Sequence, residues 1–199
     1  REILNKEPLH VVIDSTGLKV YGEGECKVRI HGYSKRRTWR KLHLAVDEKT
    51  NQILGMILTG NDIKDSQVTA DLLEQIPEEI DQVSADGAYD SENVYAAVEA
   101  RGGLTVVPPK EGAVIHQHGN TKNMPPKLRD EHVRHIRKNG KTLWKIDLKY
   151  TRRSLEETTM FRFKKTFGGS LSSRIVPNQI AESALKCEIL NKFKTPSIL

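Results

Sequence analysis

The order of its short apolar runs constrains this chain more than any other feature. Strand-like runs occur at five places, residues 9–13, 39–46, 53–59, 82–85 and 104–107. The first three follow one another directly, whereas the last two alternate with helical periodicity, which begins at Asp65 and is closed by Pro77 in its first occurrence. Three strands followed by alternating helices and strands predict an α/β fold, with an open mixed five-stranded sheet flanked by helices.

Two aspartates follow buried strand-like runs. Asp14 comes directly after LHVVI, and Asp86 comes directly after QVSA. Taken alone, Asp14 is better explained as a turn or cap residue than as a catalytic one. If the first and fourth strands are neighbours in an open sheet, both carboxylates emerge at the same edge, where such sheets place their sites.

A late segment, YTRRSLEETTMFRFK, carries a third candidate acid on a predicted helix. Its polar residues at spacings of three, four and seven project within roughly 60° of one another on a helix, namely Tyr150, Arg153, Glu157 and Lys164. A neighbouring apolar stripe could seat this helix on a core, namely Met160, Phe163 and Phe167. A solvated charged face with an Arg153–Glu157 pair is the alternative interpretation of the segment.

Three carboxylates gathered at one place predict a metal site, because their mutual repulsion is costly unless cations neutralise it. Ligation by oxygen alone favours Mg²⁺ or Mn²⁺ over zinc. Two such ions can activate an attacking oxygen and stabilise the leaving oxygen of a phosphodiester. Arg153 and Lys164 would then neutralise phosphate oxygens, with Lys164 about 10 Å along the helix from Glu157 and therefore on flanking DNA.

Charge and composition agree with a nucleic-acid partner. The 199 residues fit one domain, and the formal net charge of +6 is clustered, first at Arg36, Arg37, Arg40 and Lys41 and again between 129 and 141. No apolar run approaches the roughly 18 residues of a membrane span, and no signal peptide is evident, so we expect a cytoplasmic protein without a membrane partner.

The remaining features have structural interpretations. Cys26 and Cys187 are expected to be free thiols, and the histidines at 116, 118, 132 and 135 to be solvated rather than zinc ligands. Residues 111–127 are expected to form an exposed loop, and a basic helix is expected over 129–139, ending at Gly140. A last helix from Pro177 has as its apolar set Ile180, Ala184, Leu185, Ile189 and Phe193.

Taken together, these motifs resemble the DDE transposases of bacterial insertion sequences, in the broad group that includes families four and five. The late segment reproduces that group's Y-x2-R-x3-E-x6-K signature at Tyr150, Arg153, Glu157 and Lys164. Asp14 in VVIDST and Asp86 in SADGAYDS resemble its first and second catalytic aspartates, and TVVPPK resembles the segment after its fifth strand. The similarity extends through KVRIHGYSKRRTWRKLHLAVDEKT and over nearly the whole chain.

The resemblance implies a ribonuclease-H-like fold and cut-and-paste cleavage and strand transfer at transposon ends. Asp14, Asp86 and Glu157 would be the catalytic residues and the ligands of two Mg²⁺ ions, for which Mn²⁺ may substitute. DNA contacts are expected from Tyr150, Arg153, Lys164, Arg36, Arg37 and Lys110. A homodimer or larger assembly in the bacterial cytoplasm would bind transposon ends and target DNA.

The expected organisation is one catalytic domain over residues 1–199, with an insertion of loop and basic helix at about 111–149. An N-terminal region that helps such proteins recognise transposon ends would be missing, and Cys26 stands where an aromatic residue is expected. Two other functions remain open from the residues alone. One is a non-catalytic DNA-binding remnant of a transposase, and the other is a recombinase that uses Tyr150 as its nucleophile.

Overall fold

The computed structural model describes residues 7–20, 38–117, 125–150 and 154–193, with the backbone alone described at 38 and 154–158. Its strands are β1 (Leu9–Val20), β2 (Thr38–Asp47), β3 (Ile53–Gly60), β4 (Ile80–Ala85), β5 (Leu104–Val106) and β6 (Ser170–Leu171). Its α-helices are α2 (Thr69–Glu74), α3 (Glu92–Ala100), α4 (Leu128–Asp147), α5 (Ser154–Phe167) and α6 (Val176–Lys192). Two short 3₁₀ turns, η1 (Asp65–Gln67) and η2 (Gly87–Tyr89), follow β3 and β4.

One mixed sheet organises these elements, in the order β3-β2-β1-β4-β5. β2 runs antiparallel to both β1 and β3, whereas β4 is parallel to β1 and to β5. The two-residue β6 pairs with the far end of β1 and makes the sheet six-stranded, one strand more than predicted. The predicted mixed α/β, ribonuclease-H-like architecture is confirmed, and β1 and β4 are neighbours as the argument from the sequence required.

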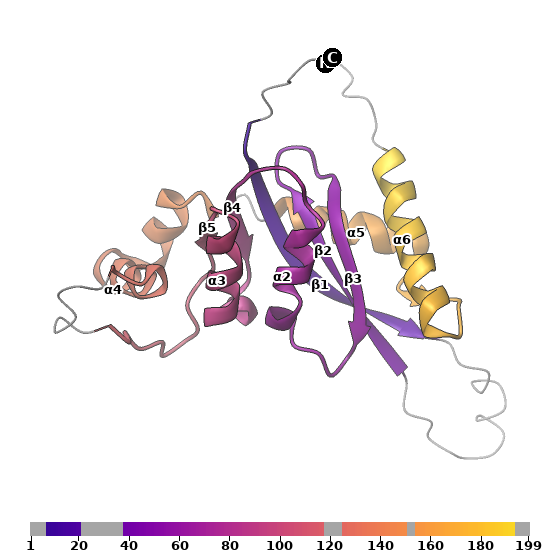
Figure 1. The fold of residues 1–199 in the computed structure, drawn as a ribbon, viewed down its shortest axis with the longest axis horizontal. Coiled ribbons are helices and arrows are strands. Elements are labelled where there is room, and N and C mark those ends of the chain that lie inside the picture. Colours follow the sequence, from indigo (N-terminus) through magenta and orange to yellow (C-terminus); the bar gives the residue numbers. More distant parts are fainter. Residues whose placement is uncertain (1–6, 21–37, 118–124, 151–153, 194–199) are drawn as a thin grey trace.

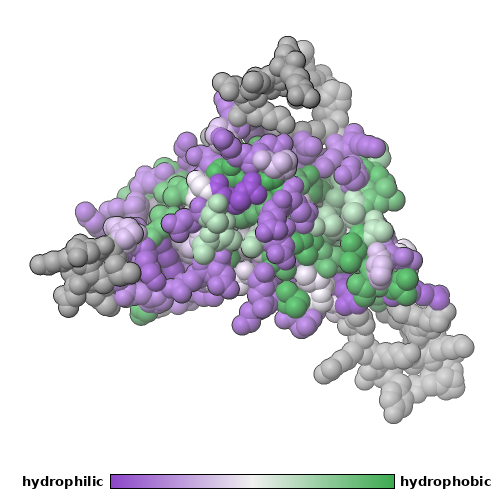
Figure 2. Space-filling view, in the orientation of Figure 1, coloured by the Kyte–Doolittle hydropathy of each residue, from purple (hydrophilic) through white to green (hydrophobic). Residues whose placement is uncertain are grey.

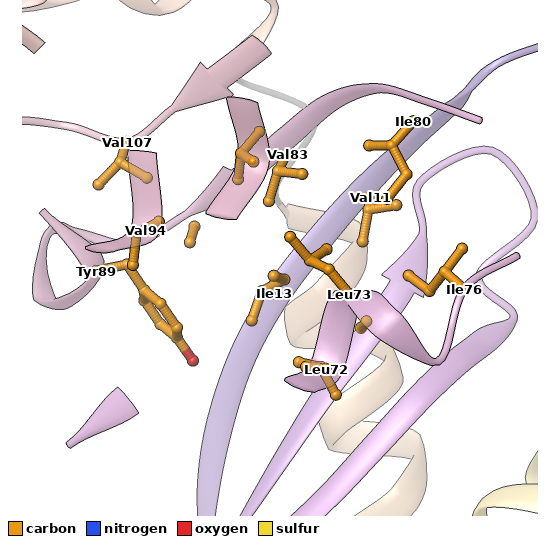
Figure 3. Packing of buried hydrophobic residues seen from close by; sticks show 13 residues of the cluster. Val11, Ile13, Leu72, Leu73, Ile76, Ile80, Val83, Tyr89, Val94 and Val107 are labelled. Atoms are coloured by element: carbon orange, nitrogen blue, oxygen red, sulfur yellow. The ribbon is translucent and has the colours of Figure 1, made fainter. Parts of the chain in front are cut away.

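Helices cover both faces of the sheet (Figure 1). On one face, Val11 and Ile13 of β1 pack against residues of α2 and α3, among them Leu72 and Val94 (Figure 3). On the other face, a second buried cluster joins the sheet to α5 and α6 through Leu18, Leu42, Leu44, Met160, Phe163, Cys187 and Leu190. Because side chains alternate along a strand, β1 presents Val11 and Ile13 to the first face and Val12 and Asp14 to the second.

β1 is longer than predicted, and Asp14 lies inside it rather than at its end. The strand continues through Asp-Ser-Thr-Gly because residues 14–20 are paired with β2, from Asp14 opposite Leu44 to Val20 opposite Thr38. A local sequence typical of a turn is therefore overridden by partners provided from elsewhere in the chain.

Two other elements differ from their predictions. The helix expected from Asp65 is broken into η1 and α2. The apolar residues that carry its helical periodicity are all buried, namely Val68, Leu72, Leu73 and Ile76. In α6 the buried side chains are Gln179, Ser183, Cys187 and Leu190, while Ile180, Leu185 and Phe193 of the predicted apolar set are exposed.

Polar anchoring explains why α6 turns a different face to the sheet. The Gln179 side chain accepts a hydrogen bond from Arg40 Nε at 2.9 Å, and Asn191 pairs with the backbone of Ile53 at 2.8 and 2.9 Å. Exposed apolar side chains therefore contribute to the surface over α6, on the right of Figure 2.

The predicted insertion lies between β5 and α5 and contains α4. Gly140, with φ of 85° and ψ of 158°, interrupts this helix, so the predicted end of the basic helix at Gly140 is a sharp break between two helical pieces. Across the break, Trp144 Nε1 donates to His132 Nδ1 at 3.1 Å and His135 Nε2 lies 2.9 Å from Asp147 Oδ2.

The insertion corrects the prediction of solvated histidines, because His132 is buried. Because the Trp144 indole can only donate, His132 Nδ1 is the acceptor and the ring is neutral. Burial lowers the pKa of His132, which agrees with this assignment. His116 is exposed, as predicted, and His118 falls outside the described residues. Cys187 is a free, buried thiol whose pKa burial raises to about 12, whereas Cys26 falls outside the described residues.

None of the helices in the described part of the chain is both long enough and apolar enough to cross a membrane.

Candidate active site

The register between β1 and β4 brings two of the predicted acids together. Val12 lies opposite Ser84 and Ile13 opposite Ala85, so Asp14 and Asp86 are the next residues on two adjacent parallel strands. Paired residues of parallel strands point to the same face, and neighbouring strands lie about 4.8 Å apart. Both carboxylates are therefore on the sheet face that α5 and α6 cover.

Side-chain contacts along the two strands support this assignment of the face. Before the two acids in the sequence, His10 Nε2 lies 2.8 Å from Ser84 Oγ, and Gln82 Nε2 donates to the carbonyl of Leu148 at 3.1 Å. His10, Gln82 and Ser84 alternate in step with Asp14 and Asp86. The end of the insertion, at Leu148, thus lies on the same face as the two acids.

The turn after β4 fixes the position of Asp86. Its Oδ1 accepts a hydrogen bond from Ala88 N at 2.8 Å, and its carbonyl accepts one from Tyr89 N at 3.1 Å. A short polar side chain at the start of a turn commonly bonds the backbone two residues ahead. Asp86 is half-buried at the start of η2.

Asp14 is likewise half-buried, and its Oδ1 accepts a hydrogen bond from Ser15 N at 2.8 Å. β1 is paired with β2 at Asp14 and with β4 up to the preceding Ile13, so regular strand backbone carries Asp14. Asp14 is thus presented by a regular strand and Asp86 by the first residue after one, which favours a precise geometry of the site.

Tyr89 shows that a further carboxylate lies close by. Burial raises the pKa of Tyr89, and the negative charges of Asp65, Asp14 and Asp86 raise it further, while Ser15 opposes the shift. Tyr89 is almost fully buried, with its ring beside Ile13 in Figure 3. Asp65, in η1 after β3, is therefore part of the electrostatic surroundings of the two strand acids.

Asp65 has its own basic neighbours on β2. Its Oδ1 lies 3.0 Å from Lys41 Nζ and 3.6 Å from His43 Nδ1. His43 is completely buried, and burial lowers its pKa to about 4. Lys41 therefore neutralises Asp65.

The sequence did not predict Asp65, Tyr89 and His43 as neighbours of the site. Tyr89 stands three residues after Asp86 in the same motif, and this proximity was the only available signal. Nothing in the spacing of Asp65 or His43 indicates that the sheet brings them together.

α5 packs on the sheet face that carries the two aspartates. Met160 and Phe163 are buried in the cluster that includes Leu18 and Leu42, and Phe167 packs against it, so the predicted apolar stripe is confirmed. Glu157 lies in the first turn of this helix, one turn before Met160, and its side chain is outside the description, as is all of Arg153. Lys164 is exposed in the last turn of α5.

Tyr150 is not part of α5, which corrects the prediction of one helical stripe through Tyr150, Glu157 and Lys164. It precedes the helix and follows Lys149, which has a positive φ of 54°. The Tyr150 hydroxyl donates to the carbonyl of Ala85 at 3.2 Å, and its ring packs on Trp144 with centroids 5.2 Å apart. Tyr150 thus touches the residue directly before Asp86.

The other predicted DNA contacts are spread along the chain. Lys110 is exposed just beyond β5, while Arg36 and Arg37 fall outside the described residues. Among the described side chains, no group of three or more His, Cys, Asp and Glu residues could hold a metal ion. The site as described therefore consists of the Asp14–Asp86 pair, with α5 alongside it.

Comparison with known proteins identifies the class. Residues 5–186 match the model of the transposase DDE domain family, so the chain belongs to that family. Among solved structures, it is similar to a piggyBac transposase in a cryo-EM structure of the synaptic complex with hairpin DNA, at 11% identity and a TM-score of 0.47. That match covers 94% of this chain and 47% of the other, so this chain spans about half the length of that protein.

Proposed function

We propose that this chain is a DDE transposase catalytic domain that cleaves DNA at transposon ends and joins the freed ends to target DNA. The observation that carries the proposal is the register of β1 and β4, which makes Asp14 and Asp86 neighbours on one face of the sheet. The membership in the transposase DDE domain family supports the same reaction. The net charge of +6 suits a DNA partner, bound by a homodimer or a larger assembly.

The residues present fit a magnesium site. Asp14 and Asp86 offer carboxylate oxygens, which are the ligands that Mg²⁺ and Mn²⁺ prefer. With Glu157, they would hold two Mg²⁺ ions, for which Mn²⁺ can substitute. When bound, such ions supply Lewis-acid activation of the attacking oxygen and stabilisation of the leaving oxygen at a phosphodiester.

The protein's own residues position the reacting groups. Paired backbone holds Asp14, and the turn after β4 holds Asp86, so both carboxylates are in place before DNA binds. The hydrogen bond from Tyr150 to Ala85 ties the start of the α5 segment to the strand that carries Asp86. Arg153 and Lys164 would bind phosphates, with Lys164 roughly 10 Å along the helix axis from Glu157 and so on flanking DNA.

The alternative with Tyr150 as nucleophile has little support. Its side chain is 6% exposed, and its hydroxyl is engaged with the carbonyl of Ala85. A nucleophile needs a neighbouring base that accepts its proton and open access to the substrate. The geometry instead favours a structural and DNA-proximal role for Tyr150.

A metal-dependent cleavage assay tests the proposal. We expect the chain to nick supercoiled plasmid DNA in the presence of Mn²⁺, and Asp14→Asn or Asp86→Asn to reduce the rate at least a hundredfold. Each substitution removes a charge that neutralises the ion while keeping the shape of the side chain. Each should also weaken Mn²⁺ binding, measured without DNA by electron paramagnetic resonance.

Neighbouring glutamates provide the matched control for the third acid. Glu157→Gln should abolish nicking, whereas Glu156→Gln, one residue away in the same turn of α5, should leave it within about twofold. If the Asp86→Asn protein nicks DNA as fast as the parent, the chain is not a DDE enzyme. Salt-sensitive DNA binding without any nicking would instead indicate a non-catalytic remnant.

A further inference from the structure

A buried ion pair links the insertion to the strand that carries Asp86. Arg129, in the first turn of α4, donates from Nε to Asp90 Oδ1 at 2.8 Å and from Nη2 to Asp90 Oδ2 at 3.0 Å. The Asp90 side chain is completely buried and that of Arg129 is 16% exposed. Two parallel hydrogen bonds from a planar guanidinium fix both the distance and the orientation of the two groups.

Asp90 is separated from Asp86 by the short turn η2 alone. The turn is closed by Asp90 N donating to the carbonyl of Gly87 at 3.3 Å, while Asp86 Oδ1 accepts from Ala88 N at 2.8 Å. Any displacement of Asp90 therefore acts on the same three residues that hold the Asp86 carboxylate. The Arg129–Asp90 pair constrains the end of the turn at Asp90. The other end of this turn is Asp86, the metal ligand of the proposed function.

Asp90 and Arg129 also bind two further segments, the chain just after β5 and the loop before α4. Asp90 Oδ2 also accepts a hydrogen bond from Lys110 N at 3.0 Å, which fixes the chain just after β5. Arg129 Nη1 donates to the carbonyl of Val114 at 3.1 Å, and the neighbouring Asp130 accepts from Gln117 N at 2.7 Å. Asp90 and Arg129 thus hold the turn after β4, the chain after β5 and the start of α4 to one another.

We propose that Asp90 and Arg129 are positioning residues that set the place of the Asp86 carboxylate, and with it the affinity of the site for its metal. Neither residue touches the reacting atoms. The inference rests on the proposed function, because it takes Asp86 to be a metal ligand. It also removes Arg129 from the basic residues available to DNA, since its guanidinium is occupied by Asp90 and Val114.

Mn²⁺ affinity, measured on the chain without DNA, gives a readout that a loss of stability alone would not change. Asp90→Asn removes the charge from the pair, and Arg129→Lys keeps the positive charge but loses the two-point geometry. Each should weaken Mn²⁺ binding about tenfold, at the low end of the effect of residues that orient metal ligands. Far-UV circular dichroism would show that both variants remain folded at the temperature of the titration.

Glu131→Gln is the matched control. Glu131 pairs with Arg134 in the same helix, but both side chains are well exposed, so its Mn²⁺ affinity should equal that of the parent. If Asp90→Asn fails to fold, Arg129→Lys decides the outcome, because it leaves no buried carboxylate without a cation.

Asp86→Asn separates this inference from the proposed function. Weaker Mn²⁺ binding in Asp86→Asn, Asp90→Asn and Arg129→Lys supports both. Weaker binding in Asp86→Asn alone, with the two pair variants at the parent's affinity, overturns the positioning role and leaves the function in place. Unchanged binding in Asp86→Asn overturns the proposed function and the positioning role with it.

Discussion

At the scale of single residues, Glu182 on α6 shows how one carboxylate can hold a chain segment in place. Its oxygens accept hydrogen bonds from Ser172 N at 3.0 Å and Ser173 N at 2.8 Å, and from Lys186 Nζ at 2.7 Å. Burial alone would raise the pKa of Glu182, but the hydrogen bonds from Lys186 and the two serine amides outweigh it and lower the pKa to about 2. Glu182 thereby anchors the segment between β6 and α6.

The lowered pKa predicts a defined pH dependence of stability. The contribution of Glu182 should be fully present above its ordinary pKa of 4.5 and should disappear as the pH falls towards about 2. Glu182→Gln should lower the free energy of unfolding by about 1–3 kcal/mol at neutral pH. Urea titrations of both proteins should show this difference shrinking below about pH 4.

Glu188→Gln, an exposed position on the same helix, is the control and should change the free energy of unfolding by less than about 0.5 kcal/mol. If Glu182→Gln lowers the free energy of unfolding by the same amount at low and neutral pH, the charge of Glu182 is not the cause of its contribution.

At the scale of elements, the insertion depends on the break within α4. Gly140 has φ of 85° and ψ of 158°, a conformation that residues with a Cβ atom rarely adopt. The break folds the second helical piece back so that Trp144, fully buried, reaches His132 and Tyr150. Tyr150 in turn donates to the carbonyl of Ala85, the residue before Asp86, so the break in α4 is connected to the site.

Gly140→Ala should therefore destabilise the insertion by about 1–3 kcal/mol. Trp144 fluorescence during chemical denaturation measures this, because the indole becomes exposed when the helical pieces separate. Gly169→Ala is a matched control, since nothing lies within 4 Å of a Cβ added there and its φ is not in the left-handed region. That variant should be neutral or slightly more stable. Equal effects of the two substitutions would argue against strain at Gly140.

The elements also show where local sequence was sufficient. The apolar spacing of Met160, Phe163 and Phe167 placed the buried face of α5 correctly. The same reasoning failed at Tyr150, which shares the helical spacing of Glu157 but lies before the helix, held by Trp144 and Ala85. The spacing of residues in the sequence shows which side chains a helix would bring together. Contacts with other elements decide which of those residues are in the helix.

At the scale of the whole molecule, the distribution of exposed cations relative to the proposed site bears on DNA binding. Lys110 follows β5 and its backbone N–H is bound to Asp90, which places it near the turn that carries Asp86. Lys49 lies in the turn between β2 and β3, beside the start of β1, and its Nζ is 2.7 Å from Glu7. These two lysines lie at opposite ends of the strands. Of the two, Lys110 is on the side of the proposed site.

If the proposed DNA partner is correct, Lys110→Gln should reduce the slope of log affinity against log salt concentration by about 1, because one phosphate contact fewer releases one counterion fewer. Fluorescence anisotropy with a labelled duplex over a range of salt concentrations measures that slope. Lys49→Gln should leave it unchanged. A slope that both variants reduce equally would show that DNA is not confined to this side of the protein.

The sequence by itself determined the order of the first five strands, the apolar stripe of α5 and the identity of the acidic motifs, because each depends on local periodicity or on a short contiguous pattern. Only the tertiary structure decided that β1 continues through Asp14, that Asp65 and Tyr89 lie beside the aspartates, and that Arg129 is bound to Asp90. These features depend on strand register and on contacts between segments far apart in the chain, and a register is fixed by which partner strand is available.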